Sequence, residues 1–137
     1  MSDRFPYVKD NDHAYLDQVL NTKPSDNGYD LLVTGDVNIV AEIKCNRPIN
    51  NGYKFGSAQK NGIIKDFKGL LGGKSKVKSL DPVEAYKFLA IYDFGEHTLL
   101  ATQHLIKNLP ADLKDKVSIY DVSKPLTMDK VFVVFIK

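Results

Sequence analysis

The feature that most constrains the fold is a nearly continuous apolar run at residues 85–94, AYKFLAIYDF, which is rich in aromatic residues. Strands buried on both faces carry such runs, whereas a strand with one wet face alternates apolar and polar residues. A central strand of this kind needs other elements packed on both faces of its sheet. The run therefore predicts an α/β protein.

The rest of the chain supplies the neighbours that this strand needs. Strand composition and helical periodicity alternate along it, separated by turn residues. Helices are predicted at 12–21, 58–71 and 97–109, and strands at 30–34, 38–45, 85–94, 117–122 and 130–137. The order α-ββ-α-β-α-β-β predicts a central mixed β-sheet flanked by helices.

The middle helix is the best defined of the three. Ser57 is a candidate N-cap, and the Gly72-Gly73 pair is a stop signal. Its apolar residues, which we expect to face the core, are Ile63, Ile64, Phe67, Leu70 and Leu71. Residues 46–56 contain too much Pro, Gly and Asn to form a regular element.

Bulk properties limit the class of protein. The 137 residues suffice for one domain, 1–137, and no apolar run approaches the roughly 20 residues of a membrane span. The N-terminus has neither the apolar core of a signal peptide nor the character of a transit peptide, so we expect a cytoplasmic protein. Cys45 is the single cysteine, which excludes an internal disulfide and a cysteine zinc cluster.

Charge is distributed unevenly. Between Lys44 and Lys78 nine basic residues stand against one acid, Asp66, which gives +8, and since the chain carries +2 the remainder carries −6. Such a band predicts a docking surface for a polyanion, although solvated loops and helix faces are also rich in lysine. The lysines assigned to nucleic-acid binding are Lys54, Lys60, Lys65, Lys68, Lys74, Lys76 and Lys78.

The predicted hairpin places acidic residues opposite one another. If the loop is Gly35-Asp36-Val37, cross-strand partners have numbers that sum to 72, and Asp30 faces Glu42. Lys44 projects from the same face because side chains alternate along a strand. A two-residue loop would instead put the two carboxylates on opposite faces. In this register the residues expected to point into a core are Ile39, Ala41, Ile43 and Cys45.

Two opposed carboxylates repel each other unless a cation lies between them. Mg²⁺ fits best, with Mn²⁺ as a substitute, because it prefers hard oxygen ligands and usually takes one or two carboxylates from protein and the rest from water and phosphate. Lys44 would hold or deprotonate the attacking water and offset developing negative charge.

Asp30, then eleven residues, then Glu42-Ile43-Lys44 at the end of a second strand resembles the motif of the PD-(D/E)XK nuclease superfamily, which has the restriction-endonuclease-like fold. The resemblance implies a Mg²⁺-dependent deoxyribonuclease. It also implies that Gln59, on the following helix, helps to position the site. Tyr29 stands where the family motif has proline, and Asp17 is the only candidate for the acid that some members contribute from their first helix.

Other residue types add little chemistry. Tyr53 and Phe55 could stack on a base, or bury their own loop. The glycines of the middle helix, Gly56, Gly62 and Gly69, fit close approach to nucleic acid or tight helix packing. A histidine metal site is not expected from the spacing of His13, His97 and His104. No fingerprint of an organic cofactor is present.

Three functions remain open at this point. The first is an active endonuclease acting on DNA, although phosphate contacts do not distinguish RNA. The second is an inactive module of the nuclease fold that binds nucleic acid or a partner protein. The third is an interaction protein whose strand at 130–137 pairs with another chain. The same strand could form a homodimer of the nuclease.

Overall fold

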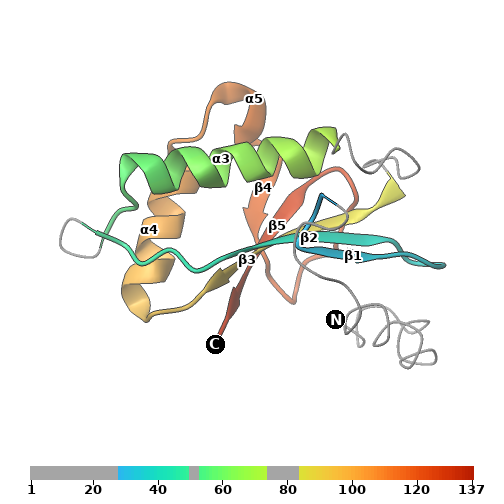
Figure 1. The fold of residues 1–137 in the computed structure, drawn as a ribbon, viewed down its shortest axis with the longest axis horizontal. Coiled ribbons are helices and arrows are strands. Elements are labelled where there is room, and N and C mark those ends of the chain that lie inside the picture. Colours follow the sequence, from blue (N-terminus) through green and yellow to red (C-terminus); the bar gives the residue numbers. More distant parts are fainter. Residues whose placement is uncertain (1–27, 50–52, 74–83) are drawn as a thin grey trace.

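A five-stranded mixed sheet forms the centre of the computed structural model, which describes residues 28–49, 53–73 and 84–137 (Figure 1). The strand order is β1-β2-β3-β5-β4; β1 runs antiparallel to β2, and the other neighbouring pairs are parallel. The strands are β1 (Leu31–Val33), β2 (Ile39–Lys44), β3 (Tyr86–Tyr92), β4 (Val117–Ile119) and β5 (Val131–Ile136). The helices are α3 (Ser57–Gly72), α4 (Glu96–Lys107) and α5 (Ala111–Lys114). The predicted mixed sheet with helices is confirmed, while the helix predicted at 12–21 lies outside the described residues.

β3 is the middle strand of the sheet, as its apolar run predicts. Its residues from Lys87 to Ile91 are all buried. Lys87 is only 2% exposed, and its ammonium group donates hydrogen bonds to the carbonyl oxygens of Ala85, at 2.9 Å, and of Met128. A charged group inside an apolar strand is tolerated when carbonyl oxygens accept hydrogen bonds from it. The buried Lys87 is therefore compatible with a central position of β3 in the sheet.

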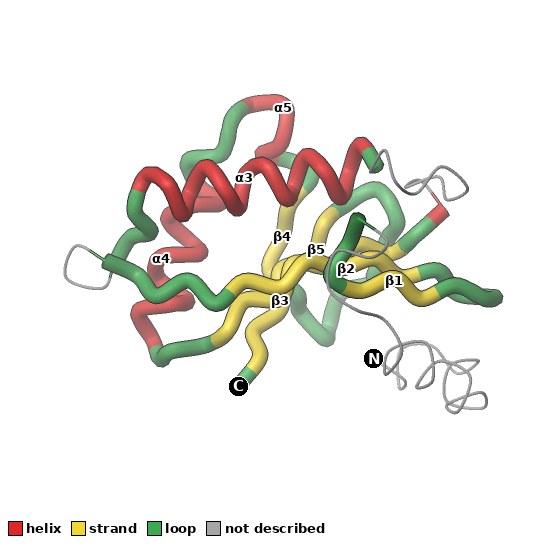
Figure 2. Tube along the Cα trace, in the orientation of Figure 1, coloured by secondary structure: helices red, strands yellow, loops and turns green. Residues whose placement is uncertain are grey.

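α3 lies across one face of the sheet (Figures 1 and 2). Ile63, Phe67 and Leu70 are fully buried, which confirms the apolar stripe. Its start differs from the prediction, because Ser57 is the first helical residue and Gly56 is the N-cap. Its end is as predicted: Gly73 has a φ of 85° and donates its N–H to the carbonyl of Gly69 at 2.9 Å.

The two faces of the sheet are packed differently. Val40, Leu89 and Ile91 belong to the larger cluster with α3. A smaller cluster on the other face contains Val33, Ile39, Ala41, Phe88 and Phe132.

Burial was wrongly predicted for the end of β2. Ile43 is 45% exposed and Cys45 is also exposed, although Ile39 and Ala41 are buried as expected. The reason is that the ladder with β1 ends at the pair Leu31↔Ala41. Beyond that pair β2 continues with no described strand on its outer side, and Ile43 and Cys45 project from the face opposite α3, where they face solvent.

The C-terminal elements bring two further differences. The four-residue helix α5 follows Pro110 and was not predicted, and β4 ends at Ile119, three residues before the predicted strand ends at Val122. β5 lies between β3 and β4. The strand predicted at 130–137 is therefore interior to the sheet over Val131–Val133 and not an edge strand there, while its pairing with another chain and a homodimer stay predictions. From Val131 to Val133 both of its edges are paired within the sheet, whereas β4 does not extend along the residues that follow.

None of the helices in the described ranges combines the length and the apolar character needed to cross a membrane.

Candidate functional site

The hairpin formed by β1 and β2 has the predicted register. The paired residues are Leu31↔Ala41, Leu32↔Val40 and Val33↔Ile39, and each pair sums to 72. The connection between the strands is closed by Asn38, whose side-chain oxygen accepts the N–H of Gly35 at 3.2 Å. The ladder ends one residue before Asp30; continued by one step, the same register would bring Asp30 level with Glu42.

Glu42 lies on the face of the sheet that α3 covers. Val40, two residues earlier, is fully buried in the cluster under α3, and alternation gives Glu42 and Lys44 the same side. Glu42 is only 6% exposed. A carboxylate removed from water to this degree needs a positively charged or hydrogen-bonding environment.

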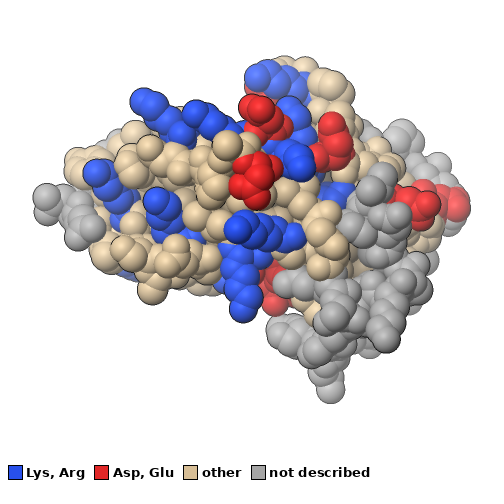
Figure 3. Space-filling view, turned by 90° about the horizontal axis from the view of Figure 1, so that it is seen from above, with Lys and Arg blue, Asp and Glu red and all other residues tan. Residues whose placement is uncertain are grey.

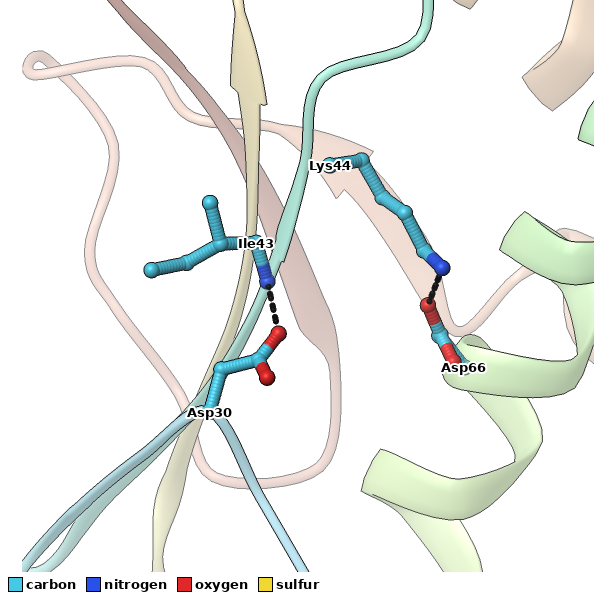
Figure 4. A network of polar contacts seen from close by, with 4 residues as sticks. All are labelled: Asp30, Ile43, Lys44 and Asp66. Atoms are coloured by element: carbon cyan, nitrogen blue, oxygen red, sulfur yellow. Dashed lines mark hydrogen bonds and ion pairs between the residues drawn. The ribbon is translucent and has the colours of Figure 1, made fainter. Parts of the chain in front are cut away.

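Lys44 forms an ion pair with Asp66 of α3. Its Nζ lies 2.7 Å from Asp66 Oδ2, and Figure 4 shows the lysine reaching from the end of β2 to the helix. The two side chains are 28% and 15% exposed. Asp66 Oδ2 itself is buried and makes no hydrogen bond of good geometry, so this ion pair is its main compensation.

The role of Asp66 was not predicted from the sequence, although two signals point to it. Asp66 is the one acid in the basic band between Lys44 and Lys78. It also lies seven residues after Gln59, which places both on the same side of α3. That side faces the end of β2, as the contacts of both residues show.

Asp30 closes the end of the hairpin ladder. Its Oδ2 accepts the backbone N–H of Ile43 at 2.8 Å (Figure 4). Because β1 ends at Leu31, this carboxylate takes the place of a strand partner for that N–H. Within the described residues its second oxygen, Oδ1, makes no hydrogen bond. Asp30 therefore has a structural role and a remaining oxygen that points to no described partner.

Gln59 ties together the connection that follows β2. Its Oε1 accepts the N–H of Gly56 at 2.9 Å, and its Nε2 donates to the carbonyl of Arg47 at 3.0 Å. These bonds fix the first turn of α3 to the segment after Lys44. The side chain of Gln59 thus acts on the backbone near the site, and its contacts do not include the two carboxylates of the hairpin.

Close approach explains one of the three glycines. A Cβ on Gly56 would lie 2.7 Å from Cδ1 of Ile49, so the backbone there is crowded by the protein itself. A Cβ on Gly62 would meet nothing within 4 Å, so helix packing does not require that glycine.

The predicted basic residues of α3 do not gather beside Lys44. At about 100° per residue, Lys60, Lys65 and Lys68 lie roughly 120°, 100° and 160° around the helix from Asp66. Figure 3, which views the molecule from the side of α3, shows Lys and Arg side chains dispersed over the surface with acidic side chains among them. Lys54 is exposed on the connection before α3. Lys74, Lys76 and Lys78 lie outside the described residues.

The donor set suits a magnesium ion only in part. Among the described residues, no group of three or more His, Cys, Asp and Glu side chains is placed to hold a metal. Asp30 and Glu42 would supply one or two hard oxygen ligands, and water and phosphate oxygens would complete the octahedron, which is how Mg²⁺ is commonly held.

The remaining candidates are resolved by burial. Phe55 is 8% exposed and packs in the core, whereas Tyr53 is 50% exposed. His97 packs against Tyr53, with ring centroids 4.6 Å apart. His104 lies in the last turn of α4, while His13 and Asp17 fall outside the described residues.

Comparison of the chain with protein-family models, with curated proteins and with solved structures finds no match. The resemblance to the PD-(D/E)XK superfamily therefore stays a prediction from the sequence. The arrangement of Asp30, Glu42 and Lys44 around the end of β2 is the structural basis on which a function can be argued.

Proposed function

We propose that this protein is a metal-dependent endonuclease that hydrolyses phosphodiester bonds of DNA, with Asp30 and Glu42 as metal ligands and Lys44 as the catalytic base or stabilising cation. The observation that supports the proposal is the register of the hairpin from Leu31 to Val33. Extended by one residue, this register would bring Asp30 level with Glu42, and side-chain alternation puts Lys44 on the side of Glu42. This combination is the one expected of a restriction-endonuclease-like site.

The end of β2 is a suitable place for such a site. β1 stops at Leu31 while β2 continues to Lys44, so the outer side of β2 has no described strand beyond Ala41. A DNA backbone could approach there without displacing a strand. A bound Mg²⁺ or Mn²⁺ would polarise the scissile phosphate and lower the pKa of a coordinated water.

Lys44 can act while its ion pair is intact. An ammonium group has three N–H donors, and the contact with Asp66 uses one of them. The other two can donate hydrogen bonds to the attacking water or to a phosphate oxygen. Asp66 is thus a positioning residue in this proposal, because it acts on the reaction only through Lys44.

One observation favours the alternative of an inactive binding module. Lys44 is already paired with Asp66, and Asp30 already accepts the N–H of Ile43, so both have structural roles that do not require catalysis. A module of this kind would keep the three residues for stability and bind DNA without cutting it.

Cleavage assays separate these two functions. Linear, circular, single-stranded and branched DNA would be incubated with wild-type protein in Mg²⁺, Mn²⁺ or EDTA, and compared with Lys44→Met and Glu42→Gln. Lys107→Met is the matched control, since Lys107 is an exposed lysine of α4 that is not among the lysines predicted to bind nucleic acid. Circular dichroism would establish that each variant is folded.

We expect metal-dependent cleavage that falls by about 10²-fold or more in Lys44→Met, as is typical for loss of a general acid–base group, and is unchanged in Lys107→Met. Cleavage that persists in Lys44→Met would refute the assigned centre. DNA binding by a folded wild-type protein that cuts no substrate would favour the binding module.

A further inference from the structure

Exposed aromatic and basic side chains gather where β2 and β3 end. Tyr53, Tyr92 and Phe94 are 50%, 38% and 37% exposed, which is high for such large rings. Two exposed basic residues accompany them: Lys54, which follows Tyr53 in the sequence, and Arg47, which lies shortly after β2. These five residues are called the aromatic surface below. Rings left open to solvent next to cations are unusual in a plain structural loop and are typical of binding surfaces.

Contacts join three members of the aromatic surface, Arg47, Tyr92 and Phe94, and a fourth, Tyr53, packs on α4. The guanidinium carbon of Arg47 lies 4.3 Å from the centroid of the Phe94 ring. Tyr92 and Phe94 have centroids 4.8 Å apart with planes tilted by 55°. Tyr53 packs against His97 with a tilt of 56°. The rings in both pairs are tilted and not stacked, and Tyr53, Tyr92 and Phe94 all remain partly exposed although Arg47 lies over one face of Phe94.

The backbone under this surface is held in place. The N–H of Phe94 donates to the hydroxyl of Thr98 at 3.0 Å, and the N–H of Gly95 donates to the Asp93 carboxylate at 2.8 Å. Gly95 has a φ of 122°, a backbone conformation that residues with a side chain rarely adopt. A ring held on a fixed turn loses little entropy when it binds a ligand.

The backbone of Arg47 is held by a hydrogen bond from α3, and Arg47 lies near the proposed centre. Its carbonyl accepts a hydrogen bond from Gln59 at 3.0 Å. It follows Lys44 by three residues, which span at most about 11 Å of extended chain. The aromatic surface and the proposed centre are therefore within a few nucleotides of each other.

We propose that the aromatic surface binds an unpaired DNA strand, and that the preferred substrate carries unpaired nucleotides beside the bond that is cut. Bases stack on Tyr53, Tyr92 and Phe94, while Arg47 and Lys54 contact phosphates. The substrate preference rests on the proposed nuclease function, whereas the binding does not. In a duplex the faces of the bases are covered by their neighbours, so exposed rings gain nothing from it, but an unpaired strand offers every base to a ring.

Binding can be measured without cleavage. Fluorescence anisotropy in EDTA would compare a labelled oligo(dT) with an abasic strand of the same length, which keeps the phosphates and lacks the bases. Tyr92→Leu and Phe94→Leu keep apolar volume and remove the ring, while Phe94→Tyr keeps a ring. Val122→Ala is the control, since it trims exposed apolar surface in the loop after β4.

Wild-type protein should bind oligo(dT) at least about tenfold more tightly than the abasic strand, the size expected when one base stacks on an aromatic ring. Phe94→Leu and Tyr92→Leu should each reduce this difference, and Phe94→Tyr and Val122→Ala should preserve it. Equal affinity of wild-type protein for the two strands overturns the proposal. This comparison needs no variant, so a misfolded variant cannot obscure it.

Failure of this inference and failure of the nuclease function give different results. Base-dependent binding without cleavage of any DNA would keep the aromatic surface and refute the enzyme. Cleavage of duplex and single-stranded DNA at equal rates, with equal affinity for oligo(dT) and the abasic strand, would keep the enzyme and refute the aromatic surface. Preference for duplex DNA over oligo(dT) in binding would also refute it.

Discussion

Removing the two partners of the Lys44–Asp66 ion pair one at a time should have unequal effects on stability. Lys44→Met leaves the buried Oδ2 of Asp66 with no compensating charge. Asp66→Asn leaves a lysine that is 28% exposed and can reach water. Loss of the lysine should therefore cost more than loss of the acid.

The magnitudes follow from the burial of the two groups. Exposed ion pairs contribute up to about 1 kcal/mol, and breaking a fully buried pair costs about 3–5 kcal/mol. With Asp66 at 15% exposure, we expect a loss of about 2 kcal/mol in the free energy of unfolding for Lys44→Met. Asp66→Asn should lose about 1 kcal/mol or less, because the amide can still accept a hydrogen bond from Lys44.

A double-mutant cycle in urea, with EDTA present to exclude metal effects, measures the coupling between the two residues. The double variant should lose about 1 kcal/mol less than the sum of the single variants. A melting experiment should show the same order, with roughly 3–5 °C lost per kcal/mol for a chain of this size. A larger loss for Asp66→Asn than for Lys44→Met, or additive losses, would refute the view that the buried oxygen depends on Lys44.

Three further effects can be measured on single variants. Gln59→Ala removes two hydrogen bonds from the side chain to the backbone and should lower the free energy of unfolding by about 1–2 kcal/mol in urea titrations. An unchanged free energy of unfolding would contradict the role of these bonds. Gly95→Ala has space for its Cβ but a positive φ, so thermal melts should show a loss of about 1–3 kcal/mol from backbone strain alone. Hydrogen bonds from Ser123 lower the pKa of Asp121 below its ordinary value of 3.8. The stabilisation from ionised Asp121 is therefore present above that value and lost as the pH falls through the lowered pKa, and Ser123→Ala should raise this pKa in an NMR titration.

The hairpin could be predicted from sequence because its signals are local. Gly35 and Asn38 bound a short connection, and alternation along residues 39–42 leaves only one register that buries Ile39 and Ala41 together. The opposition of Asp30 and Glu42 follows directly from that register. The stripe of α3 was predictable for the same reason, since its period of 3.6 residues lies within one segment.

What the sequence could not show depends on neighbours distant in the chain. The exposure of Ile43 and Cys45 depends on where β1 ends, and the pairing of Lys44 with Asp66 depends on how α3 crosses the sheet. A strand composition at 131–136 does not tell whether the strand is central or at an edge, because apolar runs occur in both.

The position of β5 also has a consequence for the order of folding. β5 follows every other described strand in the sequence, yet it lies between β3 and β4 and pairs with both. Among the described strands β4 has no other partner, so it cannot join the sheet before β5 has been synthesised. During translation, the edge of β3 that pairs with β5 would stay unpaired until β5 is available, and β5 would then bring β4 into the sheet.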